Sequence, residues 1–131
     1  MTQDLTAEFP RQRRWAVVGV SESREKYGNK IYRDLKEAGY EVYGVNPKLE
    51  TIEGDRCYAS LADLPTKPDV VNVVVPPQAG VAVVNDCLKL GLKRIWFQPG
   101  AESEEAVLLA QKNGMDVVHD ACIMIQKQQW V

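Results

Sequence analysis

The sequence predicts a single doubly wound α/β domain, with a mostly parallel sheet and helices on both faces. Three observations support this prediction. The chain has 131 residues, a length that suits one domain. Short apolar segments rich in β-branched residues alternate with longer amphipathic segments. The spacing of the apolar segments leaves room for right-handed crossovers between parallel strands. We expect the domain to cover residues 14–131, preceded by a loose lead-in at residues 1–13.

Composition narrows the class of protein further. Hydrophobic residues make up 45% of the chain and charged residues 26%, which is typical of a globular domain and excludes a wholly disordered chain. The formal net charge of −2 gives no reason to expect nucleic-acid binding. No apolar run approaches the ~20 residues that cross a bilayer, and the N-terminal segment lacks the apolar core of a signal peptide. We therefore expect a cytoplasmic protein with no nucleic-acid or membrane partner.

The three cysteines predict neither disulfides nor a metal site. Cys57, Cys87 and Cys122 are odd in number and lie 30 and 35 residues apart. This spacing fits neither a disulfide framework nor a Cys-x-x-Cys metal knuckle. We expect reduced, mostly buried side chains that pack as small hydrophobic groups, in keeping with the cytoplasm.

The first half of the chain contains signals for two strands and a helix. Residues 14–20 form a short apolar run bounded by a loop, which predicts a strand covered on both faces. Asn29 is expected to cap a helix that runs to about residue 38, and Gly39 stands where a left-handed C-terminal cap is favoured. A strand at residues 40–45 follows, and Pro47 ends it because proline cannot donate to a ladder.

The second half repeats the alternation. A short strand is expected around residues 56–58, followed by a single helical turn begun by Ser60. Residues 70–75 (VVNVVV) form the strongest strand signal in the chain. Further segments predict a helix at 78–90, a strand at 94–97, a helix at 102–113 closed by Gly114, and a strand at 115–118. The acidic residues of the 102–113 segment lie in its first turn, where they complement the helix dipole.

In a doubly wound sheet, ligands bind beyond the carboxyl ends of the strands, near the point where strand order reverses. The first strand exit, GVSESREKYGNK, suits a phosphate. Its small residues allow close backbone approach, its hydroxyls donate hydrogen bonds, and the next helix presents unpaired N–H groups. The candidate residues in this exit are Gly19, Val20, Ser21, Ser23, Lys26, Tyr27 and Gly28. An ordinary loop with turn-forming serines is the alternative.

The second exit departs from the pattern of NAD-binding domains. Those domains place an acidic residue at the end of the second strand to bind the ribose diol, whereas this chain has Asn46, Pro47 and Lys48. A lysine favours a phosphate on the ribose, as in NADP or coenzyme A. A solvated surface lysine is the alternative.

The third and fourth exits have less specific patterns. Val75, Pro76 and Pro77 can form a rigid apolar shelf for an adenine ring, although Pro77 can equally begin the next helix. The fourth exit contains Gln98 and Gly100. Gln98 can bond an amide of a pantetheine arm, although turn structure alone explains the proline and glycine that follow.

Together these segments resemble the coenzyme A-binding domain family. This Rossmann-like module also forms the N-terminal part of the succinyl-CoA synthetase alpha subunit and of NDP-forming acyl-CoA synthetases. The matching segments occur in the family's order, and the chain looks closest to the stand-alone members. They are residues 18–30 (VGVSESREKYGNK), 44–48 (GVNPK), 58–65 (YASLADLP), 73–77 (VVVPP) and 96–106 (WFQPGAESEEA). The resemblance covers about residues 14–125.

The resemblance implies that the chain binds coenzyme A or an acyl-CoA, and because the residues offer no evident reactive machinery, we expect no catalysis of its own. Residues 19–23 and the helix after Gly28 would hold the diphosphate, and Lys48 would meet the phosphate-bearing adenosine end. Residues 75–77 would flank the nucleotide, while Phe97 and Gln98 would touch the pantetheine. The sequence lacks the glycine-rich loop pattern of the synthetases, and it has no counterpart of their second domain, which carries the phosphorylated histidine.

Two alternatives to a stand-alone binding protein remain. The chain can be a component that presents coenzyme A to a separate ligase or transferase, or it can be an NADP-binding domain. His119, Asp120 and Cys122 form the only cluster that invites a nucleophile, but neighbours on a strand face opposite sides, which predicts a structural role for His119. A homodimer is a further alternative, with Trp130 packed either on its own domain or on a neighbouring subunit.

Overall fold

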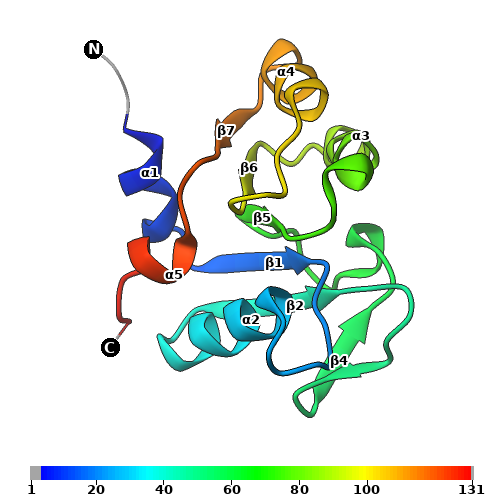
Figure 1. The fold of residues 1–131 in the computed structure, drawn as a ribbon, viewed down its shortest axis with the longest axis vertical. Coiled ribbons are helices and arrows are strands. Elements are labelled where there is room, and N and C mark those ends of the chain that lie inside the picture. The colour runs from blue at the N-terminus through cyan, green and yellow to red at the C-terminus, as the bar shows by residue number, and fades with distance from the viewer. Residues whose placement is uncertain (1–3, 131) are drawn as a thin grey trace.

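The computed structural model describes residues 4–130 and contains a seven-stranded sheet (Figure 1). The strands are β1 (Arg14–Val18), β2 (Glu41–Val45), β3 (Thr51–Ile52), β4 (Asp55–Tyr58), β5 (Val70–Val73), β6 (Arg94–Phe97) and β7 (Asp116–Val118). They lie in the order β3-β4-β2-β1-β5-β6-β7. Every neighbouring pair is parallel except β3 and β4, which are antiparallel. This arrangement confirms the predicted doubly wound, mostly parallel sheet.

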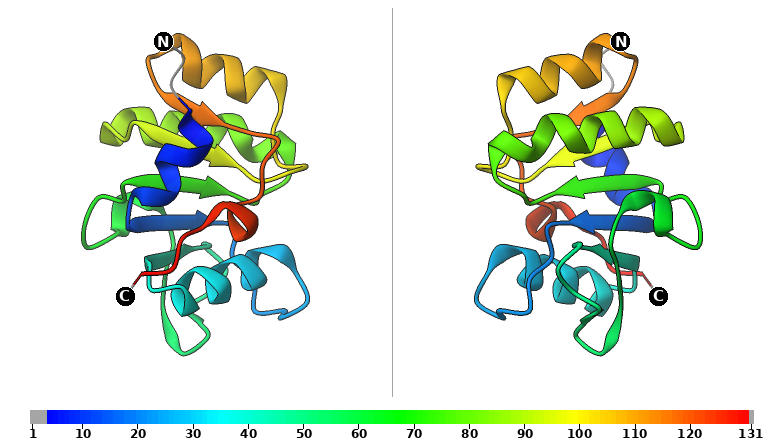
Figure 2. Two further views of the ribbon diagram at one scale, coloured as in Figure 1. Left: turned by 90° about the vertical axis from the view of Figure 1, so that its left-hand side faces the viewer. Right: turned by 90° about the vertical axis from the view of Figure 1, so that its right-hand side faces the viewer.

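Helices cover both faces of the sheet. They are α1 (Leu5–Glu8), α2 (Tyr27–Glu37), α3 (Gly80–Leu90), α4 (Glu104–Lys112) and α5 (Ile123–Gln126), with short 3-10 turns η1 (Phe9–Arg11), η2 (Leu61–Asp63) and η3 (Pro77–Ala79). Figure 2 shows α1, α2 and α5 on one face and α3 on the other, where α3 packs beside α4. Within residues 4–130, no helix has the length and apolar character needed to cross a membrane.

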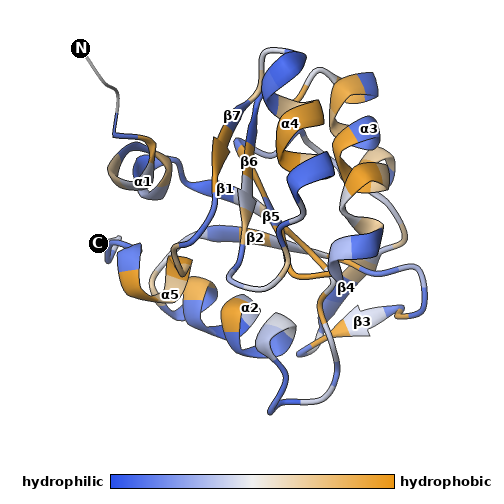
Figure 3. Cartoon of the chain, turned by 45° about the horizontal axis from the view of Figure 1, so that its top comes forward, coloured by the Kyte–Doolittle hydropathy of each residue, from blue (hydrophilic) through white to orange (hydrophobic). Residues whose placement is uncertain are grey.

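The alternation of side chains along β1 divides the core into two clusters. Trp15 and Val17 face α2, where they pack in a cluster with Leu35, while Ala16 belongs to the opposite cluster beneath α3 and α4. All four residues of β5 are buried, as expected for a central parallel strand covered on both faces. Figure 3 shows hydrophobic residues concentrated in β5 and α3 and many hydrophilic residues along α2.

The helix after the first strand begins earlier than expected. Lys26 occupies the N-cap position of α2, and its side chain makes no capping hydrogen bond. Asn29 lies in the first turn, fully buried, so the prediction that it caps the helix is wrong. At the other end, Gly39 has a φ of 94°, which agrees with the left-handed position expected after the helix.

The short hairpin of β3 and β4 was predicted only in part. The sequence indicates the strand near residues 56–58 but not its two-residue antiparallel partner β3. The turn between them places Glu53 at a φ of 47° and Gly54 at 83°. A two-residue strand carries no periodicity, so its pairing with β4 can be seen only in the tertiary structure.

The N-terminal segment is more ordered than a loose lead-in. Residues from Leu5 to Arg11 are helical, and Asp4 caps α1 through its side chain. Phe9 is fully buried, with its ring centroid 6.1 Å from that of Trp96. Residues 1–3 of the expected lead-in lie outside the described residues. The segment is ordered, contrary to the prediction, because Phe9 packs against Trp96, which is distant in the sequence.

Candidate nucleotide-binding site

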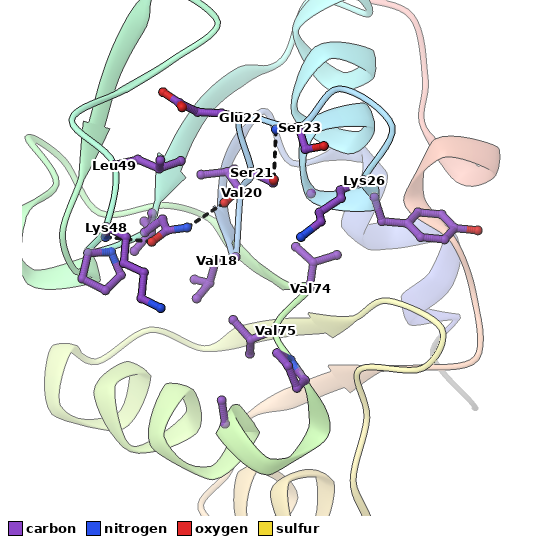
Figure 4. Close-up of a pocket in the computed structure, with 18 of the residues that line it drawn as sticks. Val18, Val20, Ser21, Glu22, Ser23, Lys26, Lys48, Leu49, Val74 and Val75 are labelled. Carbon is purple, nitrogen blue, oxygen red and sulfur yellow. Dashed lines mark hydrogen bonds between the residues drawn. The ribbon is translucent and has the colours of Figure 1, made fainter.

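A cavity of about 1100 Å³ lies beyond the carboxyl ends of β1, β2 and β5 (Figure 4). Strand order reverses here, because β2 lies on one side of β1 and β5 on the other. This is the location at which open α/β sheets bind their ligands. The cavity is lined by residues from the three strand exits: Val18, Gly19, Val20, Ser21, Glu22, Ser23, Glu25, Lys26, Tyr27, Gly28, Val45, Asn46, Pro47, Lys48, Leu49, Val74, Val75, Pro76 and Ala79.

The structure brings most of the candidate residues together. All candidates from the first two exits line this cavity, as do Val75 and Pro76. Gln98 and Gly100 line a second cavity of about 250 Å³, which shares Tyr27, Val75 and Pro76 with the first. The two cavities therefore adjoin along the exit of β5.

Two candidates lie outside both cavities. Phe97 is fully buried at the end of β6, in the core cluster below α3, so its side chain has no surface to offer a ligand. Pro77 begins η3, which agrees with the alternative that it starts the next helix. In both cases the residue has a packing or backbone role that explains its type.

Two glycines allow α2 to approach the first strand exit. A Cβ atom on Gly28 would lie 2.3 Å from the carbonyl oxygen of Gly19, which is closer than any real contact. Gly19 itself has a φ of 105°, and a Cβ there would meet the backbone of Val75 at 3.0 Å. The loop therefore requires glycine at both positions, and it holds the N-terminus of α2 against the end of β1.

Unpaired backbone donors line the cavity. Among residues 4–130, the N–H groups of Ser21, Glu22, Tyr27 and Gly28 have no hydrogen-bond partner. Tyr27 and Gly28 belong to the first turn of α2, where intrahelical partners are lacking and the helix dipole is positive. Such a set of donors is suited to binding an anion.

Asn46 ties the second strand exit to the first. Its Nδ2 donates to the carbonyl oxygen of Val20 at 2.8 Å, and its Oδ1 accepts from the backbone N–H of Lys48 at 2.8 Å. Both ends of the amide are thus engaged within the chain. Asn46 lines the cavity, but its hydrogen bonds fix the positions of the loop and of Lys48.

The serines of the loop differ in the freedom of their hydroxyl groups. Ser21 Oγ accepts from the N–H of Ser23 at 3.1 Å, which leaves its own O–H free to donate. The pKa of the Glu25 carboxyl lies below its ordinary value because its own backbone N–H, followed by the hydroxyl of Ser23, bonds the charged form. Ser23 is therefore engaged by Glu25, and Ser21 is the serine available to a ligand.

Two lysines flank the cavity from opposite sides. Figure 4 shows the side chains of Lys26 and Lys48 entering from the first and second exits, above a floor of Val18, Val74 and Val75. Within the described part of the chain, neither lysine has a carboxylate partner. Glu22 and Glu25 are exposed members of the wall. The two unpaired cations can therefore act on an anionic ligand at two separate points.

The second cavity is mainly apolar and contains one buried amide. Gln98 is 2% exposed, and its Nε2 donates to Asn72 Oδ1 at 3.1 Å. Gln98 Oε1 and Asn72 Nδ2 are buried and have no partner among the described residues. The remaining lining comes from small or apolar residues of the β5 and β6 exits: Val74, Val75, Pro76, Pro99, Gly100 and Ala101, together with Tyr27.

The sequence analysis did not identify several residues that line or support the two cavities. Val18 and Val45 are the last residues of β1 and β2, Val74 directly follows β5, and Leu49 follows the lysine of the second exit. Extending each exit by one residue toward its strand would have found the three valines. Asn72 could not be found in this way, because its contact with Gln98 spans 26 residues.

His119 lies outside both cavities. The expectation that His119 and Asp120 face opposite sides is wrong, because β7 ends at Val118 and Asp120 has a φ of 62°. Their side chains meet, with His119 Nδ1 2.6 Å from Asp120 Oδ2. Cys57 and Cys87 are buried and Cys122 partly so, as the sequence predicts, and all three are free thiols.

The fold and the cavity together define an α/β domain of the Rossmann-like class, with its main cavity at the switch point of a parallel sheet. A comparison with known families identifies the family. The profile of the CoA binding domain matches residues 13–128, and the chain therefore belongs to the CoA binding domain family.

Known proteins of two kinds are similar to this chain. A solved structure of a conserved hypothetical protein from Pyrococcus furiosus superposes with a TM-score of 0.84 and 45% identity, covering 87% of this chain and 98% of that one. The uncharacterized protein YneT of Bacillus subtilis is 30% identical over 88% of this chain and 85% of its own length. The ADP-forming acetate–CoA ligase I of Archaeoglobus fulgidus is 30% identical over 82% of this chain, which spans only 17% of that ligase.

Proposed function

We propose that this protein binds coenzyme A or an acyl-CoA across the carboxyl ends of β1, β2, β5 and β6. Membership of the CoA binding domain family supports coenzyme A as the ligand. The observation that carries the proposal is the pair of unpaired lysines on either side of a loop with free backbone donors. Coenzyme A has a 3′-phosphate at its adenosine end and a diphosphate further along, so it presents anions at two separate points.

The order of the strand exits matches the order of groups along coenzyme A. Lys48, after β2, takes the 3′-phosphate at one end of the cavity. The amides of Ser21, Glu22 and Gly28, with Lys26, take the diphosphate at its centre. Val75 and Pro76, on the β5 side, then direct the pantetheine arm toward the exit of β6.

The second cavity receives the thiol end of the ligand. Its apolar wall and its volume of about 250 Å³ suit the end of the pantetheine arm and a small thioester. Gln98 supplies a buried acceptor without a partner, which suits an N–H group of the arm. The cavity holds the thiol end and a small thioester within its walls, so free coenzyme A and short acyl-CoA are the ligands whose whole length the two cavities can contact.

A second candidate function is to present coenzyme A to a separate ligase. The similarity to one part of ADP-forming acetate–CoA ligases favours this candidate. Co-purification from the source cells with a ligase component supports it, whereas a protein that purifies without a partner and binds coenzyme A supports the stand-alone function. NADP also carries a ribose phosphate, and it is the competing ligand that the binding experiment must include.

Isothermal titration with coenzyme A, 3′-dephospho-coenzyme A and NADPH tests the proposal. Removal of the 3′-phosphate should weaken binding to the wild-type protein by about tenfold at low salt, which corresponds to one charge-assisted hydrogen bond. Lys48→Ala should lower the affinity for coenzyme A by about the same factor and leave the affinity for 3′-dephospho-coenzyme A unchanged.

Lys89→Ala is the matched control, because Lys89 is an exposed lysine on α3 outside both cavities. Equal wild-type affinities for coenzyme A and its dephospho form would remove the assigned role of Lys48. No binding of either form would contradict the function, and binding of NADPH alone would assign the site to NADP.

A further inference from the structure

Glu53 reaches the phosphate loop from outside the site. It lies in the turn between β3 and β4 and lines neither cavity. Its Oε2 accepts from Asn29 Nδ2 at 3.3 Å, and its Oε1 lies 3.2 Å from Arg24 Nη2. One carboxylate thus connects the β3–β4 turn to α2 and to the middle of the loop at residues 19–26.

The partners of Glu53 hold the carbonyl groups of the loop. Asn29, which is fully buried, also donates through Nδ2 to the carbonyl oxygen of Ser21 at 2.8 Å. Its Oδ1 accepts from Arg33 Nε at 2.6 Å, and Arg33 Nη2 in turn donates to the carbonyl oxygen of Arg24 at 2.8 Å. Glu53, Asn29, Arg33 and Arg24 therefore form a closed network around the outer side of the loop.

The hydrogen bonds to the loop carbonyls fix the directions of the amide groups that follow them. In a trans peptide the C=O and the following N–H point in opposite directions. The carbonyl of Ser21 is held by Asn29 and that of Val20 by Asn46, so the N–H groups of Glu22 and Ser21 face away from those side chains. These are two of the donors that have no partner among the described residues.

We propose that Glu53 is a positioning residue that sets the phosphate loop in its anion-binding conformation before the ligand arrives. The expected effect of Glu53 on coenzyme A affinity rests on the proposed function. Ordering the loop in the free protein removes an entropic cost from binding, which is the physical basis of preorganisation. The β3–β4 hairpin then serves the site by carrying this carboxylate.

Whether the removal of Glu53 weakens or strengthens ligand binding distinguishes a positioning role from a direct electrostatic effect on the ligand. Glu53 is negatively charged, as is the proposed ligand, so removal of its charge alone would strengthen binding. Removal of its contacts with Asn29 and Arg24 would loosen the loop and weaken binding. A loss of affinity on removing a negative charge is therefore expected only if the residue acts through the loop.

The experiment compares Glu53→Ala, Glu53→Gln and the control Glu50→Ala. Glu50 is an exposed glutamate just before β3 that lines neither cavity. Glu53→Ala should lower the affinity for coenzyme A by about three- to tenfold, because a partly exposed charged hydrogen bond is lost. Glu53→Gln keeps an acceptor for Asn29 and should stay within about twofold of the wild type. Glu50→Ala should leave the affinity at or slightly above the wild-type value.

Amide order parameters of the ligand-free proteins supply an independent readout. In Glu53→Ala, the order parameters of residues 21–24 should fall from about 0.85 toward about 0.6, while those of β1 and α3 stay unchanged. Unchanged order parameters, or an affinity equal to or above the wild-type value in Glu53→Ala, would overturn the proposal. If the wild-type protein binds no coenzyme A, the proposed function fails, whereas the order parameters still test the role of Glu53.

Discussion

Gly28 is the residue at which the proposed site tolerates least change. It lies in the first turn of α2, directly over the carbonyl oxygen of Gly19. Its lack of a side chain allows the helix N-terminus to sit on the strand exit, and its own N–H is one of the free donors of the cavity. The packing of α2 on the strand exit and the proposed anion binding therefore both depend on the absence of a side chain at Gly28.

Gly28→Ala should weaken coenzyme A binding severely while leaving the sheet intact. The new Cβ would lie 2.3 Å from backbone, so α2 and the loop must move apart. We expect a loss of about 1–3 kcal/mol in the free energy of unfolding from overpacking, and a loss of coenzyme A affinity beyond that of Lys48→Ala. Urea unfolding and calorimetric titration measure the two effects. Gly114→Ala is the control for affinity, because a Cβ there meets nothing within 4 Å and the position lies outside both cavities; its φ of 85° strains an alanine, so it should lower stability but not affinity. Wild-type affinity in Gly28→Ala would contradict the packing argument.

At the scale of elements, α2 is fastened to the β3–β4 hairpin by side chains at both ends. Near the loop, Asn29 contacts Glu53. One to two turns later, Asp55 of β4 accepts a hydrogen bond from Tyr32 Oη at 2.6 Å and pairs with Lys36. Burial raises the pKa of Tyr32 well above its ordinary value, so its hydroxyl remains a donor. The hairpin is thus held to the helix that carries the proposed phosphate site.

This contact predicts a pH dependence of stability. Bonds from Lys36 and Tyr32 lower the pKa of Asp55 below its ordinary value of 3.8. A carboxyl with a lowered folded-state pKa stabilises the fold above its unfolded-state pKa, and this contribution is lost as the pH falls through the folded-state value. Asp55→Asn should therefore reduce the free energy of unfolding at pH 7 by about 0.5–1 kcal/mol, a range set by solvent screening of a partly exposed group.

The difference between Asp55→Asn and the wild type should shrink as the pH falls below about 3.8. Urea unfolding between neutral pH and the acid range measures it. A difference that stays constant across this range would show that the charge of Asp55 contributes nothing. Asp63→Asn, at an exposed residue of η2, controls for the removal of a carboxylate elsewhere.

At the scale of the whole molecule, an aromatic cluster joins the two ends of the described chain. Phe9 lies against Trp96, Trp96 against Trp15, and Trp15 against Tyr40. Trp130 packs on Tyr40 with ring centroids 5.6 Å apart, so it packs on its own domain, one of the two arrangements considered from the sequence. The Tyr40 hydroxyl donates to the carbonyl oxygen of Pro10 and accepts from the N–H of Gln128. The cluster lies around the amino end of β1, away from the cavity.

Phe9→Ala should therefore lower stability without changing ligand affinity. Loss of a fully buried phenylalanine costs about 3–5 kcal/mol, as a cavity in the core remains unfilled. Urea unfolding followed by tryptophan fluorescence measures the change, and titration with coenzyme A at a temperature where the variant is folded measures affinity. Leu5→Ala is the milder control, since Leu5 is only partly buried in the same segment. A loss below about 1 kcal/mol would show that the segment packs only loosely in solution.

The sequence by itself determined the alternation of strands and helices and the exits at which a ligand is expected. These features depend on local patterns: the β-branched run of β5, the proline after β2, and the glycines of the first exit. Each acts within a few residues, so each can be read along the chain. The exits then meet because parallel strands bring their carboxyl ends to one edge of the sheet.

Only the tertiary structure decided which side chains organise that edge. Asn29 was assigned a cap from its type, but its amide holds the carbonyl of Ser21, 8 residues away. Asn46 lines the cavity as expected, but only the structure shows that its amide also holds the carbonyl of Val20, 26 residues away. Glu53, Asn72 and Phe9 likewise act on partners 24 or more residues distant. Hydrogen bonds and aromatic contacts of this kind leave no periodic signal, because a single residue is enough to make each one. The chain must fold before such partners can be identified.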